Sequence, residues 1–328
     1  MTTQTSYGLV TLNLVKELAR EHDVALFPIG QAENHPHFPV KDLIKKSKTP
    51  RRDRPCVRIF HQHSLDLFCG DPIGFPIFEL DRFTPEEEHS MKSCDKLISC
   101  SKWAQETVPM ESDLVPLGVD TGLYRAQPSF NKKPIFLHVG KVEVRKHSRE
   151  IVDLFAEEFK DEDVELWLAW DNIFTGNDDW NRYAKEKLGE KVRILPRMDY
   201  LDLPKMFTSA DAVISLSSAE GWNLPILEAM ACGKWVIATN CTGQTEFLDE
   251  SCHTIDMDEK EWAFDGIFFT EKVGKWYTVG DAQKTQFKEH LRSIFNKIQA
   301  GELNHAAARR AQEFSWQESA NKLIASLS

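Results

Sequence analysis

The chain has 328 residues, a formal net charge of −11 and 41% hydrophobic residues, which suits a globular protein of two ordinary domains. This acidic balance argues against nucleic acid or an anionic membrane surface as a partner. No apolar stretch approaches the roughly 18 residues of a transmembrane helix, and the N-terminus shows no signal-peptide pattern. Seven scattered cysteines without a Cys-x-x-Cys pair indicate reduced thiols and a cytoplasmic protein, and no cluster has metal-site spacing.

The first part of the chain alternates apolar runs with amphipathic or charged segments, which favours a parallel sheet. Helices are predicted over 9–20, 85–93 and 102–108, and strands over 24–29, 57–60, 75–80 and 96–100. Ser6-Tyr7-Gly8 predicts a glycine turn before the first helix. A doubly wound domain normally opens with a strand that precedes this turn. We expect that the true start lies upstream and restores that strand; the alternative is a sheet built without it.

A second alternating series follows a polar segment with two prolines at 124–134, which predicts a linker. Strands are predicted over 135–139, 164–170, 192–195, 212–216 and 235–239, and helices over 148–159, 180–188, 201–208, 225–231, 283–300, 304–314 and 316–327. The sequence therefore predicts an α/β protein with two doubly wound, Rossmann-like domains over 1–125 and 130–315.

The stretch from Glu220 to Glu228 joins a predicted strand to a short predicted helix. Pro225 suits the first turn of a helix, where its missing N–H costs no hydrogen bond, and Gly233 ends the helix. Two carboxylates thus flank a tight turn at the carboxyl end of a strand. Open α/β sheets bind ligands at that end, and a helix N-terminus favours a phosphate.

Several motifs in the same order resemble the GT-B glycosyltransferases. The stretch Glu220 to Glu228 is similar to the Glu-(seven residues)-Glu signature of retaining enzymes of glycosyltransferase family 4 (glycosyl transferases group 1). Leu137-His138-Val139-Gly140-Lys141 with Arg145-Lys146 resembles their basic phosphate loop. The segments 115–120 and 229–233 resemble the family's interdomain segment and the helix after its second glutamate. The resemblance is strong over 115–246 and thinner over the first 110 residues.

This resemblance implies a retaining, metal-independent transfer of a hexose-type sugar from a nucleoside-diphosphate sugar to an acceptor hydroxyl. No cofactor other than the donor substrate is implied. Two Rossmann-like domains would face each other across a cleft, with the acceptor at the N-terminal one and the donor at the C-terminal one. The terminal helix 316–328 would join the N-terminal domain, as in relatives. The donor stays open among UDP-, GDP- and ADP-linked sugars, and the acceptor among glycan, lipid and small molecule.

Without a metal, fixed cations and backbone N–H groups must stabilise the departing diphosphate. The resemblance assigns this role to Lys141 and Lys146, beside Gly140. The loop is one residue shorter than in relatives, so Arg145 is an alternative to Lys146. The alternative is that these residues are surface charges at the start of a helix, but cations at that end oppose the helix dipole.

The resemblance makes Glu228 the ligand of the ribose hydroxyls and Glu220 the catalytic-site residue that holds the donor sugar. A carboxylate suits two vicinal O–H donors. The backbone N–H groups expected to face the sugar and diphosphate are those of Gly221, Trp222, Asn223 and Leu224. The alternative is a pair of exposed glutamates that only the helix dipole favours.

Further site residues follow strands expected to point at the cleft. His61 or His63 would lie near the reacting sugar, with His61 nearer the strand end. Gly8, in a sequence that resembles the family's N-terminal glycine loop, would let the backbone approach the ligand. Arg197 and Met198 are expected near the nucleotide base, and Glu79 near the acceptor.

Two rival functions remain from the sequence. One keeps the fold and changes the reaction to that of a nucleotide-sugar epimerase or hydrolase. The other is a nucleotide-sugar-binding protein without turnover. Consumption of donor in the absence of an acceptor would favour the first, and tight binding without turnover would favour the second.

Overall fold

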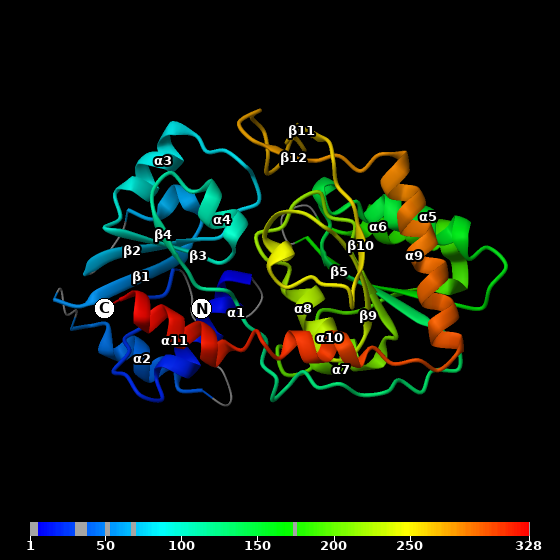
Figure 1. Ribbon diagram of the computed structural model, residues 1–328, viewed down its shortest axis with the longest axis horizontal. Coiled ribbons are helices and arrows are strands. Elements are labelled where there is room, and N and C mark those ends of the chain that lie inside the picture. The colour runs from blue at the N-terminus through cyan, green and yellow to red at the C-terminus, as the bar shows by residue number, and fades with distance from the viewer. Residues whose placement is uncertain (1–5, 30–37, 50–52, 67–69, 173–175, 328) are drawn as a thin grey trace. The chain divides into compact units, whose positions relative to one another are not determined.

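The computed structural model describes residues 6–29, 38–49, 53–66, 70–172 and 176–327, and the chain divides into two units (Figure 1). The first unit comprises Met1–Phe78, Arg82–Asp120 and Phe314–Ser328, and the second comprises Glu79–Asp81 and Thr121–Glu313. Each unit contains a parallel sheet accompanied by helices. The predicted α/β class is therefore confirmed.

The sheet of the first unit has four described strands, β1 (Pro55–Phe60), β2 (Asp71–Pro76), β3 (Lys96–Ser99) and β4 (Ser112–Leu114). They are parallel and pair in chain order. The strands predicted at 57–60 and 96–100 are confirmed. The strand predicted at 75–80 was misplaced, because β2 begins at Asp71 and ends at Pro76. Glu79 therefore follows a strand and does not close it.

The helices of the first unit are α1 (Ser6–Leu18), α2 (Val40–Lys46), α3 (Pro85–Lys92), α4 (Lys102–Thr107) and α11 (Trp316–Ser326), with a 3₁₀ turn η1 (Gln62–Ser64). Ser101 caps α4 as predicted, since its hydroxyl accepts the N–H of Ala104 at 3.1 Å. Helix α11 contacts α1 within this unit.

Two predictions near the N-terminus are wrong. Ser6-Tyr7-Gly8 is not a turn, because α1 begins at Ser6 and Gly8 lies buried in its first turn. Residues 24–29 do not form a strand. The N–H of Leu26 donates to the carbonyl of Leu43 at 3.1 Å, at the inner face of α2, and no described strand pairs with this run. A strand needs a neighbour to complete its hydrogen bonds, and apolar content does not supply one.

The main sheet of the second unit has six parallel strands in the order β10-β9-β8-β5-β6-β7. Their bounds are β5 (Ile135–Lys141), β6 (Glu165–Asp171), β7 (Val192–Ile194), β8 (Ala212–Ile214), β9 (Trp235–Thr239) and β10 (His253–Ile255). Five of these were predicted. Strand β10 and the antiparallel hairpin of β11 (Lys260–Trp262) and β12 (Lys275–Tyr277) were not.

Helices α5 (Ser148–Glu158), α6 (Asp178–Leu188), α7 (Leu203–Ser209), α8 (Leu224–Ala231), α9 (Asp281–Gln299) and α10 (His305–Ala311) complete the second unit. Its core includes Phe136 of β5, whose ring lies 5.6 Å from that of Phe155 on α5. Both rings are fully buried, and each such burial stabilises the fold by roughly 1.5–3 kcal/mol. Within the described ranges, no helix combines the length and apolar character needed to cross a bilayer.

The strand order places β5 beside β8, although β6 and β7 intervene in the chain. The winding of the sheet reverses between these two strands. Ligands bind at the carboxyl ends of strands at such a reversal. The carboxyl end of β5 leads into the predicted phosphate loop, and that of β8 leads to Glu220. The topology therefore brings the two main sequence motifs to one edge of the sheet.

Candidate functional site

The end of β5 and the loop after it carry Lys141, Arg145 and Lys146, the cations that the sequence offered for a diphosphate. A 3₁₀ turn, η2 (Val144–Lys146), places Arg145 and Lys146 just before α5. These two residues are only 5% and 8% exposed, whereas the side chain of Lys141 is 55% exposed. A Cβ atom on Gly140 would lie 3.4 Å from Cε of Lys146, so the glycine lets the lysine stem pass close to the strand. Arg145 and Lys146 are therefore built into the protein, unlike ordinary surface charges.

Glu220 receives both buried cations. Nζ of Lys146 lies 2.5 Å from its Oε1, and Nη1 of Arg145 lies 3.4 Å from its Oε2. Burial alone would raise the pKa of Glu220, but Lys146 and Arg145 outweigh burial and lower the pKa to about 2. Glu220 is thus a fixed anion at neutral pH and has no proton to donate.

Arg145 is surrounded by carboxylates. Besides Glu220, its Nη2 atom lies 2.9 Å from Oε2 of Glu143 and 3.7 Å from Oε1 of Glu79, and its Nη1 donates to the carbonyl of Ala219. Burial alone lowers the pKa of Arg145, but the three glutamates reverse this effect and raise it. Glu79, predicted near the acceptor, lies in the structure beside Arg145 of the second unit.

The turn after Glu220 is braced by a second loop, η4 (Thr242–Glu246). The N–H of Glu220 donates to Oγ1 of Thr242 at 2.8 Å, and the N–H of Gly243 donates to the carbonyl of Glu220 at 2.9 Å. A Cβ atom on Gly243 would lie 1.9 Å from the carbonyl oxygen of Gly221, so only glycine fits this approach. The sequence did not reveal these contacts.

Asn223, the residue just before α8, lies in the left-handed region, with φ of 75°. Its Nδ2 donates to Oε1 of Gln244 at 2.8 Å, and the Nε2 of Gln244 donates to the carbonyl of Thr239 at 2.6 Å. Asparagine tolerates this conformation better than most residues. Trp222 is buried, and its ring packs 5.3 Å from that of Phe247. The side chains thus fix the turn from inside, and the backbone N–H groups of 221–224 remain the candidate ligand contacts.

Glu228 lies on α8 in a different environment. It is 7% exposed, and burial raises its pKa to about 7, against a smaller lowering by the hydroxyl of Tyr124. No ion pair of Glu228 occurs among the described residues. Glu228 therefore changes its charge near neutral pH, where Glu220 does not.

Arg197 and Met198 follow β7, two strands from β5. Nη1 of Arg197 lies 3.5 Å from Oδ2 of Asp171, at the carboxyl end of β6. The Arg197 side chain is 41% exposed and Met198 is half-buried. Asp171 is the register partner of Lys141. Arg197 is thereby connected, through one ion pair and one strand pairing, to the phosphate loop.

The predicted residues of the first unit meet through Tyr7. Its hydroxyl donates to the carbonyl of Ile77 at 2.8 Å and lies 2.9 Å from Nδ1 of His61. Because a hydroxyl has one hydrogen, His61 donates from Nδ1, and Nε2 is then the acceptor of the neutral ring. Gly8 follows Tyr7 in α1. His61 is half-buried, whereas His63 is exposed and stacks on it at 5.3 Å. Sequence reasoning missed Tyr7.

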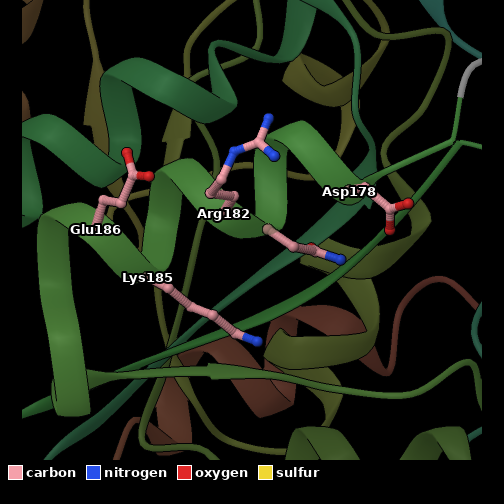
Figure 2. Close-up of a pocket in the computed structure, with 5 residues that line it drawn as sticks. Asp178, Arg182, Lys185 and Glu186 are labelled. Atoms are coloured by element: carbon pink, nitrogen blue, oxygen red, sulfur yellow. The ribbon is translucent and has the colours of Figure 1, made fainter.

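A pocket lies on the surface of α6 (Figure 2). All of its lining residues belong to that helix: Asp178, Asn181, Arg182, Lys185 and Glu186. Figure 2 shows their labelled side chains spread along the helix instead of converging on one point. None of them was predicted to act in a site, so this pocket is not a candidate.

The fold and the loop–turn arrangement of the second unit are those of a doubly wound domain of the GT-B type. Residues 121–253 match the family described as "Glycosyl transferases group 1". This segment contains the phosphate loop, Glu220 and Glu228. The predicted resemblance to this glycosyltransferase family is therefore confirmed over that segment.

Known proteins support the same assignment. The O-antigen chain mannosyltransferase B of Escherichia coli is 26% identical over 161 residues, which cover 46% of this chain and 41% of that relative. This match thus spans less than half of the relative. Sucrose-phosphate synthase of Thermosynechococcus elongatus shares the fold with a TM-score of 0.69 at 16% identity, over 98% of this chain and 92% of the other. HepE of Anabaena, in complex with UDP and glucose, has a TM-score of 0.58 at 16% identity, over 79% and 71%. The predicted GT-B fold is confirmed.

Proposed function

We propose that this protein is a retaining, metal-independent glycosyltransferase that moves a hexose-type sugar from a nucleoside-diphosphate sugar to an acceptor hydroxyl. The observation that carries the proposal is the buried cluster of Lys146, Arg145 and Glu220 at the reversal point of the sheet. It lies within the segment that matches the glycosyltransferase family. The structural neighbour HepE, solved with UDP-glucose, supports a nucleotide sugar as the donor.

The free cluster is electrically balanced. Three side chains are positive, those of Lys141, Arg145 and Lys146. The three carboxylates paired with them, those of Glu79, Glu143 and Glu220, balance this charge. A diphosphate therefore gains a cation only by replacing a carboxylate. Lys146 is suited to this exchange because it has one carboxylate partner, whereas Arg145 has three. We assign Lys146 and Lys141 to the diphosphate and make Arg145 chiefly the residue that positions Glu220.

Charge develops on the leaving diphosphate as the glycosidic bond breaks. Lys146, Lys141 and the N–H groups of 221–224 would stabilise it from a preorganised, water-poor site. Departure and attack would take place on one face of the sugar, with the donor phosphate accepting the proton of the acceptor hydroxyl. Glu220, with its lowered pKa, is unsuited to be a general acid. It is suited to accept hydrogen bonds from the sugar hydroxyls.

The first unit is assigned the acceptor. His61, with Nε2 as its acceptor atom and Tyr7 fixing its ring, is placed near the reacting sugar in this proposal. Gly8, beside Tyr7 at the start of α1, would allow close approach of the backbone. The proposal includes a cytoplasmic location, based on the pattern of unpaired cysteines in the sequence.

A nucleotide-sugar-binding protein without turnover is a second candidate, and one observation favours it. The family match begins at residue 121 and includes none of the preceding residues. The donor side thus lies within the family match, whereas the acceptor side is supported by the shared fold alone. Donor binding without product formation under any acceptor would establish this candidate.

A thermal-shift screen of UDP, GDP, ADP and their sugars tests donor binding, since a ligand of the folded state raises the melting temperature. A donor and acceptor panel, with the anomeric configuration of the product read by NMR, tests the reaction. We expect retention, unchanged by chelators. Inversion would refute the retaining mechanism. Glu220→Gln should abolish turnover, whereas Lys205→Ala, which removes an exposed ion pair with Asp202, serves as the matched control.

A further inference from the structure

The antiparallel hairpin of β11 and β12 lies outside the six-stranded sheet (Figure 1) and outside the segment that matches the glycosyltransferase family. It is nevertheless fixed beside Glu220. The N–H of Tyr277 donates to the carbonyl of Ser218 at 3.0 Å, and the buried Trp276 packs in one apolar cluster with Ala219. Ser218 and Ala219 directly precede Glu220 in the chain. The hairpin therefore packs on the turn that carries this carboxylate.

The tip of the hairpin is organised by Asp265. Its Oδ1 atom accepts the backbone N–H groups of Ile267, Phe268 and Phe269 at 2.9, 2.8 and 2.8 Å. These bonds satisfy backbone donors that an exposed loop would otherwise leave to water. The ring of Phe269 packs edge-on against that of Trp276, with centroids 5.3 Å apart. Phe268 therefore projects from a turn that is braced by hydrogen bonds and by packing.

Phe268 faces the phosphate loop. Nζ of Lys141 lies over its ring, 5.5 Å from the centroid, which is within the limit of about 6 Å for a cation–π contact. The side chain of Lys141 is 55% exposed, and a long exposed side chain samples many rotamers unless a neighbour restricts it. Phe268 is thus placed to restrict the lysine that we assign to the diphosphate.

The ring differs in kind from the other partner of Lys141. Oε1 of Glu143 lies 3.4 Å from Nζ of Lys141, and a carboxylate there also repels an incoming diphosphate. An aromatic face attracts an ammonium group through its quadrupole but carries no net charge. The ring of Phe268 can therefore stay on the lysine side chain while the charge of the lysine meets a phosphate.

We propose that Phe268 is a positioning residue of the donor site, which directs Lys141 at the diphosphate without competing for its charge. The proposal rests on the function proposed above and deepens it, because it makes the hairpin of β11 and β12 part of the donor site. Phe268 acts through Lys141 and not on the sugar. Its removal should therefore weaken only the ligands whose affinity depends on Lys141.

A double-mutant cycle measures this coupling. Phe268→Leu removes the ring and keeps an apolar side chain, and Lys141→Met removes the charge. The probe is whichever of UDP, GDP and ADP binds the wild type most tightly, followed by isothermal titration. We expect Phe268→Leu to weaken binding about two- to fivefold when Lys141 is present and less than about 1.5-fold in Lys141→Met. Phe268→Tyr keeps an aromatic face and should bind nearly as the wild type does.

Phe264→Leu is the matched control, because Phe264 is the same residue type in the same loop and is 53% exposed. Its nucleotide affinity should equal that of the wild type. The parent nucleoside, which has no phosphate, should bind equally well to the wild type and to Phe268→Leu. A general disturbance of the loop would instead weaken the nucleoside as well and would not depend on Lys141.

A measurement on the wild-type protein does not require any Phe268 variant to fold. In protein with 13C-labelled lysine, the ring should move the NMR signal of the Lys141 ε-methylene upfield of that of Lys205, which pairs with Asp202. Loss of the signal in Lys141→Met assigns it. We expect the upfield position to persist when the nucleotide is saturating. A signal at the position of Lys205 would overturn the proposal.

The outcomes separate this inference from the function on which it rests. If no nucleoside diphosphate binds the wild type, the proposed function and this inference both fail. If nucleotides bind, but Phe268→Leu binds as the wild type does or loses the same factor with and without Lys141, only this inference is overturned.

Discussion

Two glutamates, one at the turn before α8 and one on α8 itself, are in opposite electrostatic states. Glu220 has two cations within 3.4 Å, and its pKa falls to about 2. Glu228 has only a phenol, and its pKa rises to about 7. Both are buried to a similar degree, with 6% and 7% of their surface exposed. Burial alone therefore does not determine the charge of a carboxylate; the partners that are buried with it do.

In the function proposed above, this difference suits two tasks. A sugar beside a departing diphosphate needs an anion that stays ionised while charge moves, because a proton on Glu220 would free Lys146 from its partner. A ribose needs only an acceptor of hydrogen bonds, which can be neutral until the ligand arrives. The Glu220 end is thus fixed in charge, whereas the Glu228 end is adjustable. The following predictions test this contrast, from the largest expected effect to the smallest.

Removal of the lysine should have the largest effect. Lys146→Met keeps an unbranched side chain but removes the charge that balances Glu220 and that we assign to the diphosphate. We expect kcat/KM for donor turnover to fall about 100- to 1,000-fold. A coupled assay of released nucleotide measures this. We expect Lys146→Arg to recover part of the activity, and the control variant Lys205→Met to keep all of it. A decrease of less than about threefold would remove Lys146 from the reaction.

Gly243→Ala should disturb the Glu220 end alone. The new methyl group would meet the carbonyl of Gly221, 1.9 Å from an ideal Cβ, and would push the turn away from η4. We expect a loss of about 1–3 kcal/mol of stability, measured by denaturant unfolding. Gly280→Ala is the control, since its nearest atom is the side-chain oxygen of Gln283 at 3.4 Å. Equal stability of the two variants would contradict the close approach.

The two glutamates should respond oppositely to pH. The pKa of Glu228 is higher in the folded protein than in the unfolded chain. The stability that its protonated form contributes is therefore complete below about pH 4.5 and is lost as the pH rises to about 7. Glu228→Gln should therefore stabilise the free protein by about 1–3 kcal/mol at pH 8 but not at pH 4. Unfolding midpoints at both pH values measure this.

Glu220→Gln should show the reverse pattern. Its folded pKa is lowered, so its stabilising effect is present above about pH 4.5 and is lost as the pH falls toward about 2. The variant should be less stable than the wild type at pH 8, because Lys146 and Arg145 lose a buried partner. If both glutamine variants shift stability in the same direction at pH 8, the contrast between the two ends is wrong.

The smallest effect is expected outside both ends. Arg197→Ala removes a half-exposed ion pair with Asp171 and should change stability by less than about 0.5 kcal/mol. The variant should nevertheless bind the nucleoside diphosphates about two- to fivefold more weakly, because it loses the proposed contact with the nucleotide base. Titration of UDP, GDP and ADP measures this. Unchanged affinity for all three would remove Arg197 from the base site.

Local signals allowed much of the second unit to be predicted. The strand before Glu220, the proline at the start of α8 and the glycine after it are sequence neighbours, so periodicity and capping were sufficient. The burial of Arg145 was not predictable in the same way. A charged residue is normally exposed, and the carboxylates that compensate it come from positions 79, 143 and 220.

The remaining misses also depend on distant contacts. Gly243 and Thr242 support Glu220 from 22 or more positions away, and Tyr7 meets His61 across 54 positions. Residues 24–29 have the apolar content of a strand, yet the structure gives them no strand neighbour. The short strands of the hairpin, β11 and β12, have only three residues each, too few for a clear alternation.

The balanced charge of the phosphate loop has a consequence for selectivity among anions. Each of its three cations already has a carboxylate partner, so inorganic phosphate or sulfate gains little when it displaces Glu220 and leaves that carboxylate buried and unpaired. A nucleotide sugar differs, because its hydroxyls can satisfy the displaced carboxylate while its diphosphate occupies the lysine. In the function proposed above, we therefore expect the site to bind simple anions weakly, because Glu220 competes with them for Lys146. A nucleotide sugar should bind more tightly, because it can replace the partner of each group.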